Sequence, residues 1–283
     1  MWIGLFRVTR CRALPMLDCL TPHALVIPCY QEEHRLPSTS IAALLQHPDV
    51  TLWLVDDGSR DGTRARLASL AAAHPGRVRV LALGENQGKG EAVRRGMLEA
   101  LRAGAHTVGY ADADFATPPA ELLRLLDHLA ASPELDAVMG CRVARLGADV
   151  RRSPARHLLG RVFASAASLA LRSPVYDTQC GAKWFRATLA FGAALERPFS
   201  SRWAFDVELL GRLLGVFGEG PHLAAGRIHE EPLREWRHVP GSKVTLVAVA
   251  QSGADVLTML FRSRRPRPHR HDSDASSSLN DSR

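Results

Sequence analysis

The chain has 283 residues, of which 46% are hydrophobic, so it can build one large α/β domain or two small ones. Its formal net charge of +7 indicates an acidic partner, such as a phosphate-rich ligand or an anionic lipid surface. Nucleic acid is disfavoured, because aromatic residues make up only 6% and no helix-turn-helix, zinc finger or aromatic stacking platform is found.

Short apolar runs alternate with amphipathic segments between residues 24 and 140. The pattern predicts strands at residues 24–27, 51–55, 78–83, 107–111 and 136–139. It predicts helices from about residue 38 and at residues 61–73, 88–103 and 118–131. This alternation is typical of βαβ units and a mostly parallel sheet flanked by helices. Ligands of such sheets bind beyond the carboxyl ends of the strands.

The regular alternation ends after Gly140. Residues 142–161 are rich in arginine, and we expect a helix to about Leu171, a return strand within 175–185 and a helix at 200–214. The expected organisation is a single domain with terminal additions. Its parts are an N-terminal extension (1–22), an α/β domain (23–245), an interfacial helix (246–262) and a disordered basic and polar tail (263–283).

Two carboxylates one residue apart, Asp112 and Asp114, follow the strand predicted at 107–111. At a strand-to-helix junction such a pair can hold a hard divalent cation beside a diphosphate. Alternatively, Asp114 belongs to the turn and caps the helix that begins near Pro118.

Two further polar segments follow predicted strands. Asp56 and Asp57 can accept hydrogen bonds from a nucleobase or ribose, while Ser59 or Asp61 is expected to cap the next helix. The glycine-rich loop 84–90 presents backbone N–H groups and Lys89, which suit a phosphate or a ribose. No Walker loop is present, and no G-x-G-x-x-G follows the first strand, which counts against a dinucleotide-binding oxidoreductase.

Through these and further motifs, the sequence resembles the family 2 glycosyltransferases of the Rossmann-like GT-A fold. It is most similar to the dolichyl-phosphate β-glucosyltransferases and other polyprenyl-phosphate glycosyltransferases. The motifs lie at residues 27–33, 55–63, 86–94, 112–114, 177–183, 202–210, 236 and 240–243. The chain departs from the family at Ala182, where a bulky aromatic residue is usual, and at its N-terminus, where eukaryotic members carry a membrane anchor.

The resemblance implies an inverting transfer of a hexose, with glucose from UDP-glucose as the expected donor, to a polyprenyl phosphate. It implies Mg²⁺ or Mn²⁺ held by Asp112 and Asp114, the latter also catalytic together with Asp206 and Arg142. The nucleotide is expected to contact Pro28, Tyr30, Glu32, Asp56, Asp57, Lys89 and Asp112.

A phosphate monoester acceptor, with a second pKa of about 6, is anionic at neutral pH and needs cations more than a general base. Six arginines can serve it, unless they form only a solvated basic face: Arg142, Arg145, Arg151, Arg152, Arg156 and Arg161. By resemblance, Arg156 and Arg161 lie in the acceptor-phosphate segment, and we assign them together with Arg142. Asp206 is a base for a hydroxyl acceptor, an orienter of a neighbouring arginine, or an acid at a helix N-terminus.

The C-terminal helix and the arginines that follow it indicate where in the cell the protein acts. Residues 244–261 form either an interfacial helix, with 262–267 as a polybasic patch on an anionic lipid surface, or an ordinary core-packing helix. No segment offers the roughly 18–20 uninterrupted apolar residues that span a bilayer. The five scattered cysteines indicate a reducing compartment, so we expect a cytoplasmic protein peripheral to the inner face of the cell membrane.

Two rival functions stay open at this stage. One is a family 2 transferase that uses a hydroxyl acceptor on a glycan or lipid, with Asp206 as the base. The other is a non-catalytic nucleotide-binding regulator.

Overall fold

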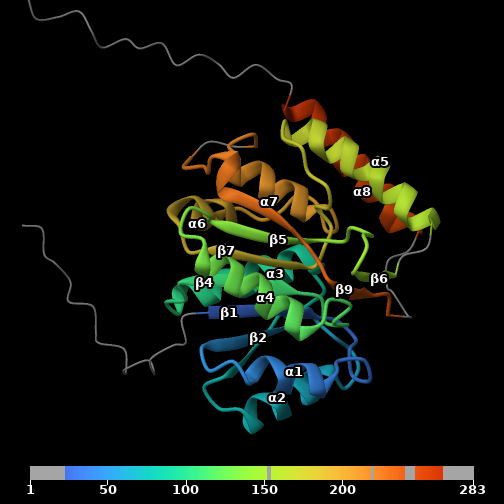
Figure 1. Ribbon diagram of the computed structural model, residues 1–283. Coiled ribbons are helices and arrows are strands. Elements are labelled where there is room, and N and C mark those ends of the chain that lie inside the picture. The colour runs from blue at the N-terminus through green and yellow to red at the C-terminus, as the bar shows by residue number, and fades with distance from the viewer. Residues whose placement is uncertain (1–22, 152–153, 218–219, 240–245, 264–283) are drawn as a thin grey trace, which may run out of the picture.

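The computed structural model describes residues 23–151, 154–217, 220–239 and 246–263 (Figure 1). Seven strands form the main sheet in the order β3-β2-β1-β4-β7-β5-β8. Their bounds are β1 (His23–Cys29), β2 (Val50–Asp56), β3 (Val78–Ala82), β4 (Thr107–Ala111), β5 (Ala137–Cys141), β7 (Ala182–Arg186) and β8 (Ile228–Pro232). A small second sheet pairs β6 (Asp149–Arg151) with β9 (Glu235–Arg237).

The main sheet is mostly parallel. Strand β1 pairs in parallel with β2 and β4, β2 with β3, and β5 with β8. Strand β7 is antiparallel to both of its neighbours, β4 and β5. The carboxyl ends of β1, β2 and β4 therefore lie at one edge of the sheet, where ligands of this architecture bind.

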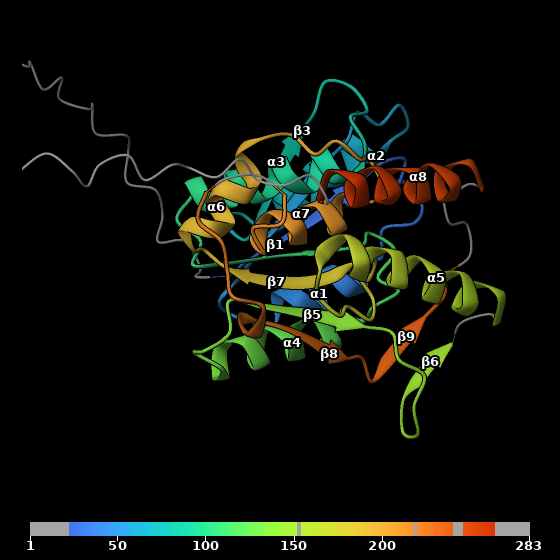
Figure 2. The same cartoon turned by 90° about the horizontal axis from the view of Figure 1, so that it is seen from above.

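Helices cover both faces of the sheet (Figures 1 and 2). Their bounds are α1 (Ser38–Leu45), α2 (Thr63–Ala73), α3 (Lys89–Arg102), α4 (Pro119–Ala131), α5 (Pro154–Leu171), α6 (Leu189–Glu196), α7 (Phe205–Leu213) and α8 (Leu246–Ser263), with a 3-10 turn η1 (Ala225–Arg227). Successive side chains of β1 point to opposite faces. Leu25 and Ile27 accordingly pack in the core with α1 and α4, whereas Ala24 and Val26 pack in the core with α3, α6 and α7.

The last long helix completes a third core, shared by α5, α7 and α8. Val256 and Met259 of α8 are buried there against Val207 of α7. Helices α5 and α8 lie side by side, as both views show (Figures 1 and 2). In the described part of the chain, no helix is both long and apolar enough to cross a membrane.

The predicted fold class is confirmed, and each element predicted between residues 24 and 140 is found within a few residues of its expected bounds. The return strand begins only at Ala182, and the helix expected from residue 200 begins at Phe205. We did not predict β6, β8, β9 or α6, all of which are short. The expected extension 1–22 and nearly all of the tail 263–283 lie outside the described residues.

Candidate active site

A cavity of about 670 Å³ opens at the carboxyl ends of β1, β2 and β4. This volume is typical of pockets for ligands of nucleotide size. Its wall contains several of the predicted residues: Pro28, Tyr30, Glu32, Asp57, Lys89, Asp112 and Asp114. The structure therefore gathers side chains from three strand ends and from the start of α3 around one cavity. This agrees with the expectation that a ligand binds beyond the carboxyl ends of the strands.

Asp112 and Asp114 stand in the turn that follows β4. The backbone N–H of Asp112 donates to the Gly181 carbonyl at 3.2 Å, which ties the turn to the start of β7. The Asp114 carboxylate accepts from the Ala116 N–H at 3.1 Å, whereas the N-cap of α4 is Pro118. Asp114 therefore shapes its own turn, and the alternative in which it caps the helix is wrong.

The two carboxylates share the cavity wall with three cationic side chains, Lys89, Arg35 and Arg202. Lys89 Nζ lies 2.5 Å from Asp112 Oδ1. Burial alone would raise the pKa of Asp112, but the charge and hydrogen bond of Lys89 outweigh it and hold that pKa below its usual value. Burial raises the pKa of Asp114, and the negative charge of Asp112 raises it further. The whole wall carries four carboxylates and three cationic side chains, so a net negative charge is left for an added cation.

The glycine-rich loop is held by Asp57. The N–H groups of Gln87 and Gly88 donate to its two carboxylate oxygens at 2.8 and 2.9 Å. We predicted backbone donors of this loop for a phosphate or ribose, but these two N–H groups bind a side chain of the protein. Gly88 has φ +95°, a conformation that favours glycine, and a Cβ there would also displace the Arg202 side chain, whose Nε would lie 2.6 Å away.

The neighbouring Asp56 is buried and does not line the cavity. Its carboxylate accepts from the Ser59 N–H at 3.0 Å and shapes the turn before α2. Of the two adjacent acids, the structure therefore brings Asp57 to the cavity and not Asp56. In the same segment Asp61 accepts from the Thr63 N–H at 3.1 Å, but the N-cap of α2 is a glycine with no side-chain cap, so the expected cap by Ser59 or Asp61 is wrong.

Other residues of the cavity wall were missed. Asn86 and Arg202 face each other there, because the Arg202 guanidinium donates to the Asn86 side-chain oxygen. Both residues lie in motifs that the sequence showed, and this is the signal that could have identified them. Gln251 reaches the wall from α8, and no pattern in the sequence pointed to it.

Asp206, in the first turn of α7, belongs to a buried network outside the cavity wall. Lys183 Nζ donates to Asp206 Oδ1 at 2.8 Å and to the carbonyls of Thr178 and Cys180 at 2.8 and 2.6 Å. The Tyr110 hydroxyl donates to the same carboxylate oxygen. The cation that Asp206 contacts is therefore a lysine and not the arginine that we considered.

Arg142 and Arg161 bind the loop that precedes β7. The Arg142 guanidinium donates to both carboxylate oxygens of Asp177 at 2.6 and 2.7 Å, a bidentate pair. Arg161 donates to the Tyr176 carbonyl at 3.1 Å, and its guanidinium carbon lies 4.1 Å from the centre of the Tyr176 ring. Neither arginine lines the cavity. The side chain of Arg156 lies outside the described part of the structure.

Arg161 instead borders a second, open hollow of about 910 Å³ beside α5. Its wall is formed by the second half of α5, the segment 172–176 and Glu230 of β8. The sequence did not predict this hollow, because it depends on how α5 packs on the rest of the domain.

Of the described cysteines, Cys29 lines the cavity, whereas Cys141 and Cys180 do not. Cys29, Cys141 and Cys180 are buried thiols. Burial raises the pKa of Cys141 and Cys180 to about 12, so both are protonated at neutral pH and neither is an activated nucleophile.

Comparison with known proteins agrees with this geometry. Residues 24–190 match the family described as Glycosyl transferase family 2. The chain is 35% identical over 259 residues to the dolichyl-phosphate beta-glucosyltransferase of Drosophila melanogaster, covering 84% of this chain and 74% of that protein. It is 33% identical over 192 residues to the polyprenol monophosphomannose synthase of Mycolicibacterium smegmatis, covering 67% of this chain and 71% of that protein.

Solved structures share the fold at lower identity. Glucosyl-3-phosphoglycerate synthase from Mycobacterium tuberculosis, in complex with Mn²⁺, UDP and glucosyl-3-phosphoglycerate, superposes with a TM-score of 0.59 at 20% identity, covering 89% of this chain and 83% of that one. Mannosyl-3-phosphoglycerate synthase from Rubrobacter xylanophilus gives a TM-score of 0.62 at 19% identity, covering 88% and 77%. The fold is GT-A, and the chain belongs to glycosyltransferase family 2.

Proposed function

We propose that this glycosyltransferase moves glucose from UDP-glucose to a polyprenyl phosphate, with inversion at the anomeric carbon. The observation that carries the proposal is the gathering of Asp112, Asp114 and Lys89 in one cavity at the carboxyl ends of parallel strands. Relatives named for dolichyl phosphate match 84% of the chain, which supports the lipid phosphate acceptor and the choice of glucose.

Asp112 and Asp114 would hold Mg²⁺ or Mn²⁺. The residues fit such an ion, because hard divalent cations prefer carboxylate oxygens and both carboxylates reach the cavity wall. A neighbouring glycine leaves them room, since a Cβ at Gly181 would lie 2.2 Å from the Asp112 carboxylate. Related folds crystallised with Mn²⁺ and UDP also support a divalent ion. When bound, the ion would offset the charge that grows on the departing UDP.

The nucleotide would occupy the part of the cavity formed by the β1–α1 loop and the glycine-rich loop. Pro28, Tyr30 and Glu32 line this side and would contact the base and the ribose. Asp57, which holds the N–H groups of Gln87 and Gly88, would fix the loop and thereby the position of Lys89. Lys89 would then face the diphosphate with its ammonium group.

The state of Asp206 supports an acceptor that is already anionic. A general base must reach the proton that it removes. Asp206 is instead buried, bound by Lys183 and Tyr110, and outside the cavity wall. A phosphate monoester needs no such base, because it has lost its proton above a pKa of about 6. We therefore assign Asp206 a positioning role and propose a phosphate acceptor in place of a hydroxyl.

The acceptor phosphate would be bound by Arg161 and Arg156 of α5. Arg161 is half-buried, stacked on Tyr176 and placed at the border of the open hollow. Arg142 forms a bidentate pair with Asp177, so we propose that it acts by holding the loop that carries Tyr176. Its catalytic role would then be indirect.

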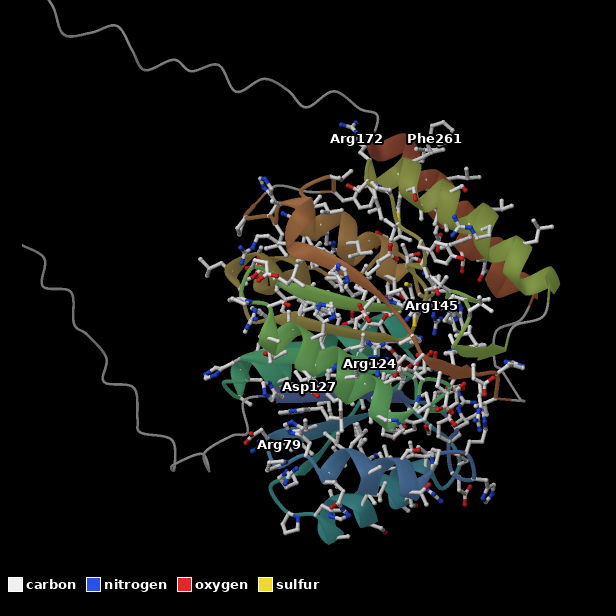
Figure 3. The ribbon with its side chains drawn as sticks, in the orientation of Figure 1. Arg79, Arg124, Asp127, Arg145, Arg172 and Phe261 are labelled. Atoms are coloured by element: carbon white, nitrogen blue, oxygen red, sulfur yellow. The ribbon has the colours of Figure 1, made fainter. Side chains whose placement is uncertain are left out.

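The paired helices α5 and α8 would contact the membrane that contains the acceptor. Both expose large apolar side chains: Leu158, Leu159, Val162 and Leu169 on α5, and Leu257 and Phe261 on α8. Figure 3 places Arg172, just beyond α5, beside Phe261, so the two helices end on the same side of the molecule. An apolar pair of this kind, followed by the arginines of 262–267, suits an anionic surface on the inner face of the cell membrane.

A transfer assay with purified protein tests the proposal. UDP-glucose and GDP-mannose are each offered with undecaprenyl phosphate or undecaprenol, with Mg²⁺, with Mn²⁺ or with EDTA. We expect a glucosyl phosphodiester of β configuration from UDP-glucose and the phosphate only, and no product in EDTA. Transfer to undecaprenol would establish the hydroxyl acceptor instead. Binding of UDP-glucose with no turnover on any acceptor or water would favour the regulator.

A further inference from the structure

A second group of metal-ligating side chains lies away from the cavity, between α4 and the edge strand β8. It consists of His128 on α4 and of His229 and Glu231 on β8, and one ligand atom from each lies within 4.8 Å of the others. Strand β8 is the outermost strand of the main sheet. His229 and Glu231 are two residues apart, so their side chains leave the strand on the same face.

The distances within this group match a tetrahedral metal shell. His128 Nδ1 and His229 Nε2 each lie 3.4 Å from Glu231 Oε2. Zinc binds nitrogen and oxygen ligands at about 2.0–2.1 Å, and tetrahedral geometry then separates neighbouring ligand atoms by roughly 3.3–3.4 Å. A direct N–H···O hydrogen bond is shorter, at about 2.9–3.0 Å. Each histidine nitrogen is therefore separated from the carboxylate oxygen by a distance closer to that of co-ligands than to that of hydrogen-bond partners.

The surrounding charges leave one carboxylate oxygen for a cation. Arg124 donates to Glu231 Oε1 at 2.6 Å, which orients the carboxylate and turns Oε2 toward the histidines. The same guanidinium is bound by both oxygens of Glu121 at 3.0 and 2.9 Å. One arginine is thus shared by two carboxylates, and this set keeps a net negative charge. Figure 3 labels Arg124 in the layer of α4.

We propose that His128, His229 and Glu231 form a Zn²⁺ site, with water as the fourth ligand. Two imidazoles and one carboxylate suit Zn²⁺, whereas the all-carboxylate pair Asp112 and Asp114 suits Mg²⁺ or Mn²⁺. None of the three residues lines the cavity, so the site is separate from the proposed donor site. A bound ion would link α4 to β8, which among the described strands hydrogen-bonds to the sheet only through β5.

Titration of the full chain with Zn²⁺ alone, after treatment with a chelator, tests the site by calorimetry. We expect the parent chain to bind one Zn²⁺. His229→Ala and Glu231→Gln should each bind it at least about a hundredfold more weakly, since changes of groups that only support the ligands already lower metal affinity by about 10–100-fold. Excess Zn²⁺, at about 100 times its Kd, should raise Tm of the parent chain by roughly 5 °C and leave Tm of both variants unchanged.

Two controls separate this site from others. His34→Ala removes a histidine whose side chain is 87% exposed, and Asp114→Asn alters the proposed donor site; both should bind Zn²⁺ as the parent does. Far-UV circular dichroism checks that each variant is folded, and His128→Gln offers a ligand change on α4 instead of β8. Equal Zn²⁺ affinity in parent, His229→Ala and His128→Gln, or no binding by the parent, would reduce the group to an ion-pair network and overturn the proposal.

Discussion

At the scale of single residues, the site depends on how each carboxylate is partnered. Asp112 is paired with Lys89, whereas Asp114 contacts only the N–H of its own turn among the hydrogen bonds found in the described residues. Asp114 can therefore offer its charge to a cation with less competition. The two acids of this pair should not be equivalent.

We expect Asp114→Ala to abolish transfer and to weaken binding of the nucleotide sugar, while Asp112→Ala retains a remnant of both. The reason is that loss of Asp112 also frees Lys89, whose ammonium group can move toward the diphosphate. Transfer rates and calorimetric UDP-glucose affinity, each with Mg²⁺ and with EDTA, provide the measurement. Full turnover by Asp114→Ala in EDTA would refute the metal assignment.

The pair of Asp206 and Lys183 allows a test of the acceptor class. Asp206→Asn should keep measurable transfer, with a rate that rises through about pH 6, where half of the acceptor phosphate is doubly ionised, to a plateau above about pH 7. A hydroxyl acceptor would instead lose its base, at a cost of about 10²–10⁴-fold. Near-total loss of transfer with normal UDP-glucose affinity would instead indicate a hydroxyl acceptor with Asp206 as its base.

A matched change of the partner isolates the structural part of this effect. Lys183→Met leaves the Asp206 carboxylate buried beside Tyr110 without its cation. Such a loss typically costs about 3–5 kcal/mol, or a fall in Tm of roughly 6–20 °C for a domain of this size. Thermal unfolding of Lys183→Met and Asp206→Asn should show the larger loss for Lys183→Met, since in Asp206→Asn the buried ammonium group keeps the carbonyls of Thr178 and Cys180 as partners.

At the scale of elements, the sequence predicts what local patterns encode. Apolar periodicity located the strands and helices between residues 24 and 140, and the polar residues that follow those strands do converge on one cavity. Local patterns do not predict contacts between segments that are distant in the sequence. Nothing local shows that Asp57 binds the loop at Gln87, or that Arg142 pairs with Asp177. Strand β8 was missed because its five residues, Ile-His-Glu-Glu-Pro, have little apolar content at a sheet edge.

Helix α5 should serve the acceptor and not the donor. Arg161→Ala and Arg156→Ala are expected to raise the apparent KM for lipid phosphate, while the Kd for UDP-glucose stays within about twofold of the parent, because Arg161 is not part of the donor-cavity wall and Arg156 precedes it on the same helix. Arg102→Ala, which removes an exposed arginine paired with Glu99 on α3, is the matched control. An equal rise in the KM for lipid phosphate and in the Kd for UDP-glucose would mean that these arginines bind the nucleotide diphosphate.

The apolar faces of α5 and α8 predict membrane contact. Leu158→Asp and Phe261→Asp should reduce sedimentation of the protein with anionic vesicles, because these side chains are 68% and 66% exposed and a carboxylate there opposes insertion. Leu189→Asp is the control, since Leu189 is 86% exposed but lies on α6. Unchanged vesicle binding in all three variants would favour the core-packing interpretation of α8.

At the scale of the whole molecule, charge and apolar surface act on the same partner. The net charge of +7 is spread over the chain, but four arginines are concentrated at 262, 264, 265 and 267, directly after the apolar face of α8. A cation at an anionic surface contributes about 1 kcal/mol, within a Debye length of about 8 Å at physiological salt. The apolar faces would supply the part of the binding that salt does not screen.

Replacement of Arg264, Arg265 and Arg267 by Gln separates these two contributions. The loss of about 3 kcal/mol should weaken binding to anionic vesicles by roughly 150-fold and remove most of its salt dependence. Turnover on a short, water-soluble polyprenyl phosphate should be unchanged, because the replaced residues follow the domain that holds the cavity. Vesicle sedimentation at several salt concentrations measures the first effect, and a transfer assay without vesicles measures the second. Parent protein whose vesicle binding is insensitive to salt would assign the attachment to the apolar faces of α5 and α8 alone.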